Sequence, residues 1–196
     1  MSIKLKKVCN THNTNHTTIA KIDVDGNLTF TENEHVFEAV YEIEKGGTKG
    51  FCVLEKADDG KTVFREVSEE VAKISHILKT EPNKAFFYSG HTNGIGGELK
   101  ALEIAKSKGG NTLEGVLADS DIKFPKFEDN PKWWEDVSAQ YAKQVSGEVR
   151  AVVGKTLRVD NIWENIELKR LKENLNVTKI TTIDPETLVE TVIFTR

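Results

Sequence analysis

Cysteine is scarce in this chain, which also lacks long apolar runs and any excess of positive charge. Among 196 residues there are two cysteines, Cys9 and Cys52, so a network of disulfides is excluded. No apolar run approaches the ~18 residues that a membrane-spanning helix needs. The net charge of -4 offers no basic footprint for a nucleic acid. We therefore expect neither a nucleic acid nor a membrane as partner.

The first residues do not have the pattern of a secretory signal. Met-Ser-Ile-Lys-Leu-Lys-Lys is basic, but no apolar core follows it. Hydrophobic residues make up 38% of the chain and charged residues 30%, as in ordinary globular proteins. These features predict a protein with a proper core that acts in the cytosol.

Residues 1–68 are predicted to form short β-strands joined by tight turns. Asp25-Gly26, Gly46-Gly47 and Asp59-Gly60 each separate two runs that are rich in β-branched or aromatic residues. Such glycine-containing pairs between apolar runs are typical of hairpins. We expect a β-rich N-terminal region, whose role the sequence leaves open.

From Ser68 the hydrophobic period changes, and residues 69–196 are predicted to mix helices with strands. Ser68 and the two glutamates after it form a helix start, and Pro82 is expected to end that helix. Residues 97–108 form a second predicted helix, with Leu99, Leu102, Ile104 and Ala105 turned inward. A third helix is expected after Asn130-Pro131. Strands are expected at 85–88 and 149–153 and, as a terminal hairpin, at 177–182 and 189–194. The predicted fold class is α+β, with domains at residues 1–68 and 69–196.

Two stretches contain ligand-type residues without the spacing that a binding site requires. Cys9, His12 and His16 have no clear fourth ligand, so zinc is not expected. The glycine-rich stretch 90–97 fails the dinucleotide fingerprint, because Leu99 stands at the third glycine position. We interpret it as a flexible turn that leads into a helix, and we predict neither metal nor cofactor.

Four segments in the second half supply aromatic faces, small hydroxyls and carboxylates. A carboxylate beside a ribose stabilises a developing oxocarbenium ion, and aromatic faces stack on nicotinamide and exclude water. Because nicotinamide leaves NAD as a neutral molecule, cleavage of its bond to ribose needs no general acid, unlike ordinary glycoside hydrolysis. The four segments are Phe87-Tyr88-Ser89-Gly90, Thr112-Leu113-Glu114, Trp134 to Ser138, and Ile162-Trp163 with Glu167.

In order and spacing, these segments resemble the active-site segments of the ADP-ribosyl cyclase / NAD glycohydrolase family. That family includes animal ectoenzymes and domains at the C-termini of bacterial polymorphic toxins. Thr-Leu-Glu at residues 112–114 matches a motif of the family directly. Trp134 with Ser138 and Trp163 with Glu167 resemble its Trp-x-x-x-Ser and aromatic-x-x-x-Glu segments. The resemblance covers residues 85 to about 183 and implies a cyclase-like domain of the bacterial branch.

The resemblance also implies a role for each of eight residues. Glu167 would be the catalytic carboxylate facing the ribose, and Glu114 would contact the carboxamide and influence which nucleophile attacks. The substrate-binding residues would be Tyr88 and Trp134 as aromatic walls, Ser89 and Ser138 as hydroxyl donors, and Ile162 and Trp163 against the phosphates.

Two positions depart from the family pattern, and one residue competes with the assigned carboxylate. Tyr88 stands where a tryptophan is usual, and Gly90 stands where the animal proteins have a phosphate-binding basic residue. Glu164 lies three residues before Glu167 and is its rival, although the spacing from Trp163 favours Glu167.

The activity that the resemblance implies is that of an NAD(P)+ glycohydrolase, a toxin or effector that depletes NAD. NAD or NADP would be its substrate, and a cognate immunity protein and delivery into a target cell by a secretion system would accompany it. Three alternatives stay open. They are an ADP-ribosyl cyclase, a mono-ADP-ribosyltransferase, and a non-enzymatic NAD-binding or interaction module with a decayed site.

Overall fold

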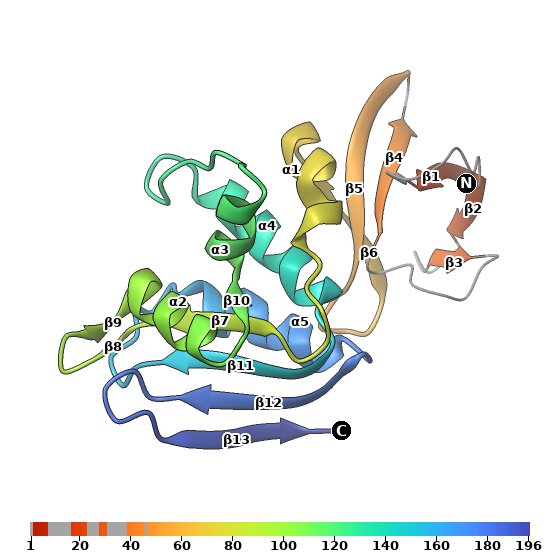
Figure 1. The fold of residues 1–196 in the computed structure, drawn as a ribbon. Coiled ribbons are helices and arrows are strands. Elements are labelled where there is room, and N and C mark those ends of the chain that lie inside the picture. Colours follow the sequence, from red (N-terminus) through yellow and green to blue (C-terminus); the bar gives the residue numbers. More distant parts are fainter. Residues whose placement is uncertain (1, 8–16, 23–27, 31–38, 46) are drawn as a thin grey trace. The chain divides into compact units, whose positions relative to one another are not determined.

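The chain consists of two compact units, Met1–His76 and Ile77–Arg196, in a computed structural model (Figure 1). The structure describes residues 2–7, 17–22, 28–30, 39–45 and 47–196. Over these residues it combines two large β-sheets, one small hairpin and five α-helices, so the predicted α+β class is confirmed. No helix within the described ranges is long and apolar enough to span a membrane.

The N-terminal unit contains a six-stranded antiparallel sheet in the order β3-β2-β1-β4-β5-β6. The turns predicted before and after β5 are confirmed, and Gly47 and Gly60 adopt the positive φ angles that glycine tolerates. The Asp25-Gly26 turn and Cys9, His12 and His16 lie outside the described residues. The strands are β1 (Ser2–Lys7), β2 (Thr17–Ile22), β3 (Leu28–Phe30), β4 (Val40–Lys45), β5 (Thr48–Lys56) and β6 (Thr62–Val67).

The helix predicted from Ser68 begins as expected but ends early. The Ser68 hydroxyl accepts a hydrogen bond from the Val71 amide at 3.2 Å and caps α1 (Glu69–Ile74). The chain then tightens into the 3₁₀ turn η1 (Ser75–Leu78), so the prediction of one helix up to Pro82 is wrong in its second half. Such tightening is common at helix C-termini.

The C-terminal unit is built on a five-stranded sheet in the order β10-β7-β11-β12-β13. The first four strands are parallel, and β13 closes the sheet as an antiparallel hairpin partner of β12, as predicted. Since β7 comes first in the chain and its two neighbours come later, strand order reverses at β7. The strands are β7 (Ala85–Ser89), β10 (Asn111–Thr112), β11 (Gly147–Val153), β12 (Val177–Ile183) and β13 (Glu190–Thr195).

Alternate side chains of β7 serve opposite faces of the sheet. Phe86 packs in a buried cluster with Ile104 and Ala105 of α2 (Gly97–Ser107), and Tyr88 packs against the same cluster. Phe87 faces the other way, and its ring centroid lies 4.8 Å from that of Tyr141 in α4 (Pro131–Gln144). Helices therefore cover both faces of β7, which explains its continuous apolar sequence.

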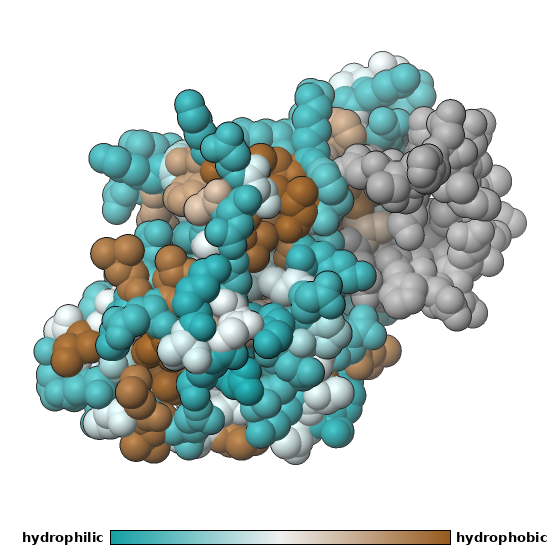
Figure 2. All heavy atoms as spheres, in the orientation of Figure 1, coloured by the Kyte–Doolittle hydropathy of each residue, from teal (hydrophilic) through white to brown (hydrophobic). Residues whose placement is uncertain are grey.

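The predicted helix α2 is confirmed, but one of its inward residues is wrong. Ala101, Ile104 and Ala105 are buried, whereas Leu99 is 80% exposed. Residues 101, 104 and 105 share one face of a helix, and position 99 lies on the opposite face at 100° per residue. Figure 2 shows exposed hydrophobic residues among hydrophilic ones on the face of the molecule that it displays.

Several short elements have no counterpart in the sequence prediction. Asn93 and Gly94 form a two-residue turn with positive φ angles, so the supposed flexible turn is an ordered hairpin. The third helix, α4, forms where it was expected, and Asn130 caps it by accepting from the Trp133 amide at 3.1 Å. The unpredicted elements are β8 (His91–Thr92), β9 (Ile95–Gly96), β10, α3 (Leu113–Asp119), the π-helical turn η2 (Trp163–Glu167) and α5 (Leu168–Glu173).

Leu99 and Leu117 provide a matched pair of leucines on helices of the same unit, the second fully buried. Leu117→Ala is expected to lower the free energy of unfolding by about 2–5 kcal/mol, because it removes buried contacts and leaves a cavity. Leu99→Ala should change it by no more than about 0.5 kcal/mol. All three tryptophans lie in residues 77–196, so tryptophan fluorescence during urea unfolding reports on this unit. Equal losses in the two variants would contradict the assigned faces.

Candidate active site

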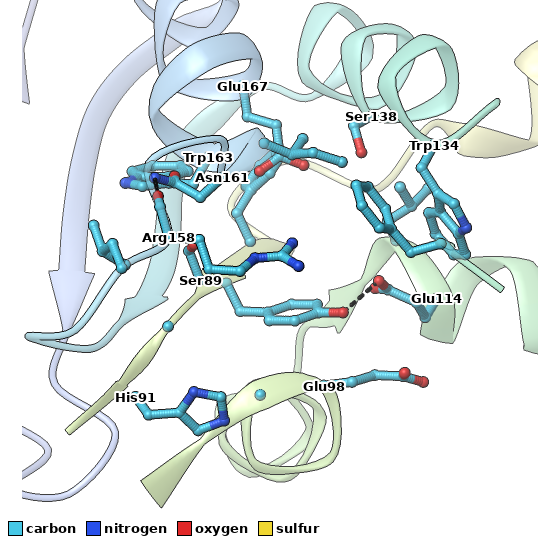
Figure 3. Close-up of a pocket in the computed structure, with 18 of the residues that line it drawn as sticks. Ser89, His91, Glu98, Glu114, Trp134, Ser138, Arg158, Asn161, Trp163 and Glu167 are labelled. Carbon is cyan, nitrogen blue, oxygen red and sulfur yellow. Dashed lines mark hydrogen bonds between the residues drawn. The ribbon is translucent and has the colours of Figure 1, made fainter. Parts of the chain in front are cut away.

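A cavity of about 690 Å³ lies at the carboxyl ends of β7, β10 and β11. In open sheets with parallel strands, ligands bind beyond the carboxyl ends of the strands where strand order reverses, and β7 is that point here. The residues that line the cavity come from β7 and the two residues after it, the first turns of α2 and α3, the loop 124–128, α4, the loop 156–162 and η2 (Figure 3). All eight residues predicted from the sequence line it: Tyr88, Ser89, Glu114, Trp134, Ser138, Ile162, Trp163 and Glu167.

Glu167 is the last residue of the π-helical turn η2, and it is 7% exposed. Burial raises the pKa of its carboxyl group to about 8, and the nearby charge of Glu114 adds to the rise. The nearby Ser138 hydroxyl favours the charged form and opposes this rise in pKa. Single π-helical turns are rare and are often found at functional sites.

Glu114 lies in the first turn of α3, and it is 9% exposed. The Tyr88 hydroxyl donates a hydrogen bond to its Oε1 at 2.7 Å, while its buried Oε2 has no hydrogen-bond partner among the described residues. Burial raises the pKa of Glu114, and the bond from Tyr88 partly offsets the rise. Glu114 therefore has one oxygen held by Tyr88 and one buried oxygen without a hydrogen-bond partner among the described residues.

The local structure of the Thr-Leu-Glu segment explains how Glu114 is positioned. The Thr112 hydroxyl caps α3 by accepting from the Gly115 amide at 3.1 Å, and Leu113 is buried. A helix that starts at this point directs the next side chain, that of Glu114, toward the carboxyl end of β7, where Tyr88 meets it. The motif thus sets the position of one carboxylate.

Two tryptophans form part of the cavity wall in different ways. The Trp134 indole donates to the Pro125 carbonyl at 3.0 Å and packs edge-on against Phe124, which fixes the loop 124–128 beside the cavity. Trp163 is buried, and its ring centroid lies 6.0 Å from that of Phe87. Its ring is therefore also part of the core.

The geometry separates the two rival glutamates. Glu164 is exposed and lies outside the cavity. Its amide donates to Asn161 Oδ1 at 2.9 Å, and Asn161 Nδ2 donates to its carboxylate at 2.8 Å. Glu164 is thus hydrogen-bonded to Asn161 at the start of η2. Glu167 is the carboxylate that lines the cavity.

The absence of a side chain at Gly90 also has a structural reason. Gly90 has a φ of +67°, and a Cβ there would overlap the Thr156 carbonyl oxygen and the Leu157 side chain. No basic residue fits at this position without a shift of the backbone.

The cavity also contains residues that the sequence patterns did not single out. Arg158 and Asn161 come from the irregular loop after β11, and Glu98 comes from the first turn of α2. A glycine-rich hairpin before α2 is the one sequence signal that could have pointed to Glu98 and His91. Four further cavity residues that the sequence patterns did not single out are Phe124, Lys126, Phe127 and Glu128.

Neither buried carboxylate has an ion-pair partner in the part of the chain that the structure describes. The charged groups that act on Glu167 and Glu114 are other carboxylates. Among the described residues, no group of three or more His, Cys, Asp or Glu is arranged to hold a metal ion. A buried carboxylate without a cation is costly, so this arrangement favours a ligand that is itself positively charged.

Comparisons with known proteins give a partial likeness to solved structures only. No protein-family model matches the chain, and no curated protein matches it. Among solved structures, the chain is similar to the crystal structure of Aplysia cyclase complexed with substrate NGD and product cGDPR. The TM-score is 0.39 at 21% identity, over 54% of this chain and 50% of that chain. This chain therefore spans about half the length of that structure.

The raised pKa of Glu167 predicts that folding loses stability as pH rises. The folded protein holds this proton up to about pH 8, whereas the unfolded chain releases it near 4.5, so stability falls between these values. Glu167→Gln should remove the loss, and the variant should unfold at higher urea than the wild type at pH 8 but not at pH 4. Each pKa unit corresponds to about 1.4 kcal/mol.

Glu164→Gln is the matched control for this measurement, because it changes an exposed carboxylate in the same turn. Its stability should follow pH as the wild type does. An identical pH dependence in the wild type and in Glu167→Gln would show that folding does not raise the pKa of Glu167.

Proposed function

We propose that the chain is an NAD(P)+ glycohydrolase, which cleaves the bond between nicotinamide and ribose to give nicotinamide and ADP-ribose. The observation that carries the proposal is the pair of buried carboxylates, Glu167 and Glu114, which line one cavity and have no ion-pair partner among the described residues. NAD brings a cationic nicotinamide ring, and the reaction moves that positive charge onto the ribose. The site thus has the complementary charge at each stage.

In the proposed reaction, the bond between ribose C1′ and the nicotinamide nitrogen breaks, and its electron pair stays with the neutral nicotinamide. The Glu167 carboxylate stabilises the oxocarbenium-like ribose, and water then attacks C1′ and loses a proton to solvent. Although burial raises the pKa of Glu167, a bound cation lowers it again. Substrate binding itself therefore promotes the ionised form that the reaction needs.

The remaining wall residues have roles that follow from their contacts. The Ser138 hydroxyl lies near Glu167 and favours the charged form of its carboxyl group. The Oε2 of Glu114, which is buried and has no hydrogen-bond partner among the described residues, would accept the carboxamide N–H of nicotinamide. Trp134 supplies an aromatic face that excludes water. A volume of about 690 Å³ lies within the range of small-molecule sites.

Release of nicotinamide from NAD and NADP by the purified chain tests the proposal directly. Glu167→Gln should lower kcat by at least ~100-fold, because it removes the charge that stabilises the transition state. Glu164→Gln should retain activity within about threefold, since exposed groups outside the site contribute little. Nicotinamide is quantified by chromatography. Absence of release from both dinucleotides rejects the proposal, and loss in Glu164→Gln alone rejects the assignment of Glu167.

Glu114 is expected to influence which nucleophile attacks the ribose. Glu114→Gln keeps the size of the side chain but removes its charge, and it should increase the share of cyclic product several-fold relative to ADP-ribose. Tyr88→Phe should act in the same direction but more weakly, because it only releases Oε1. Product chromatography measures both ratios. Unchanged ratios in both variants would remove Glu114 from product selection.

The same assays separate the alternatives. Predominantly cyclic product from the wild type identifies a cyclase, and labelled ADP-ribose on protein identifies a transferase. NAD binding without release of nicotinamide identifies a binding module. The toxin role, the immunity protein and the secretion-system delivery stay predictions from the family resemblance.

A further inference from the structure

The cavity has few positive charges for a substrate that carries a diphosphate. Its lining contains four glutamates and two cationic side chains, Arg158 and Lys126. The whole chain has a net charge of -4, so long-range attraction does not favour a dianion. Since Gly90 has no room for a side chain, the cation that holds a diphosphate must come from elsewhere in the lining.

Arg158 is held at the cavity by its backbone and by an aromatic ring. Its carbonyl accepts hydrogen bonds from Asn161 Nδ2 at 2.6 Å and from the Asn161 amide at 3.2 Å, and Asn161 is buried. Its guanidinium carbon lies 5.2 Å from the centre of the Phe127 ring. In Figure 3 the guanidinium points into the cavity. These contacts fix the direction of the side chain before any ligand binds.

The guanidinium also keeps most of its hydrogen-bonding capacity. Within the described residues its carboxylate neighbour is Asp160, 4.0 Å from Nε, which is too long for a charge-assisted hydrogen bond. Both side chains are largely exposed, so this pair contributes little. A planar fork of N–H donors beside an aromatic ring matches the geometry of two phosphate oxygens.

We infer that Arg158 binds the diphosphate of the substrate and takes the place of the basic side chain that Gly90 excludes. This inference rests on the proposed function, because it assumes that a dinucleotide occupies the cavity. Lys126 is the rival cation. It is exposed and offers a single point charge on a flexible stem, without the fork of an arginine.

Calorimetric titration with ADP-ribose tests the inference without any turnover. Arg158→Ala should raise the dissociation constant by about 10- to 100-fold, as expected for loss of hydrogen bonds to a charged group. Arg158→Lys should recover part of the affinity. Lys155→Ala is the matched control, because it removes an exposed cation of the same loop outside the cavity, and its effect should stay below about threefold. Unchanged affinity in Arg158→Ala, or a comparable loss in Lys126→Ala alone, overturns the inference.

Turnover of two substrates then distinguishes recognition of the diphosphate from a general defect. Nicotinamide riboside contains the scissile bond but no phosphate. Arg158→Ala should lower kcat/KM for NAD by about 10- to 100-fold and leave kcat/KM for nicotinamide riboside unchanged. An equal loss for both substrates overturns the inference, because Arg158 would then support the fold or the chemistry.

The two proposals fail in different ways. A wild-type chain that binds ADP-ribose through Arg158 but releases no nicotinamide disproves the glycohydrolase and retains the inference. A chain that cleaves NAD equally well without the Arg158 guanidinium does the reverse. A chain that binds neither ADP-ribose nor NAD disproves both.

Discussion

Burial of two carboxylates in one cavity is the constraint on which the rest of the C-terminal unit depends. Burial removes solvent from Glu167 and Glu114, and the charge of Glu114 raises the pKa of Glu167 further. The nearby Ser138 hydroxyl and the hydrogen bond from Tyr88 offset only part of that cost. A site of this kind keeps its shape only if the backbone around it cannot relax. The buried sheet and the helices on both faces of β7 supply that rigidity. Their packing offsets the unfavourable free energy of burying the two carboxylates that the proposed chemistry requires.

Strand β7 connects the core to the site. Phe86 and Phe87 pack against helices on opposite faces, and the next residue, Tyr88, reaches beyond the core to hold Glu114. Because strand order reverses at β7, connections leave to both sides and open a space at its carboxyl end. One short apolar strand therefore determines where the cavity lies and how one carboxylate in it is oriented.

The sequence was sufficient for features that depend on local chemistry. Ser68 and Asn130 cap helices, and glycine turns separate the strands of the first sheet, because each effect acts over a few residues. The eight site residues were found through motif order, and they do line one cavity, while their roles stay predictions. Leu99 was assigned inward because it is apolar, although in a helix it lies on the face opposite Ala101, Ile104 and Ala105. The position of Arg158 could not be predicted, since it depends on a loop without a periodic pattern and on contacts made through tertiary packing.

Charge is distributed unevenly in the cavity, and this distribution has consequences for the proposed substrate. The carboxylates of Glu167 and Glu114 are buried, whereas the cationic side chains Arg158 and Lys126 are exposed. A ligand with a cationic nicotinamide ring and a diphosphate matches this distribution in one orientation. In that orientation the nicotinamide lies at the buried carboxylates and the diphosphate at the exposed cations. Once nicotinamide has left, ADP-ribose retains the diphosphate but no longer has a cation for the carboxylates. In the proposed reaction, the buried end then no longer attracts the ligand, and Glu167 takes up its proton again because of its raised pKa. The carboxylates that would bind the cationic substrate would therefore contribute little to binding of the product.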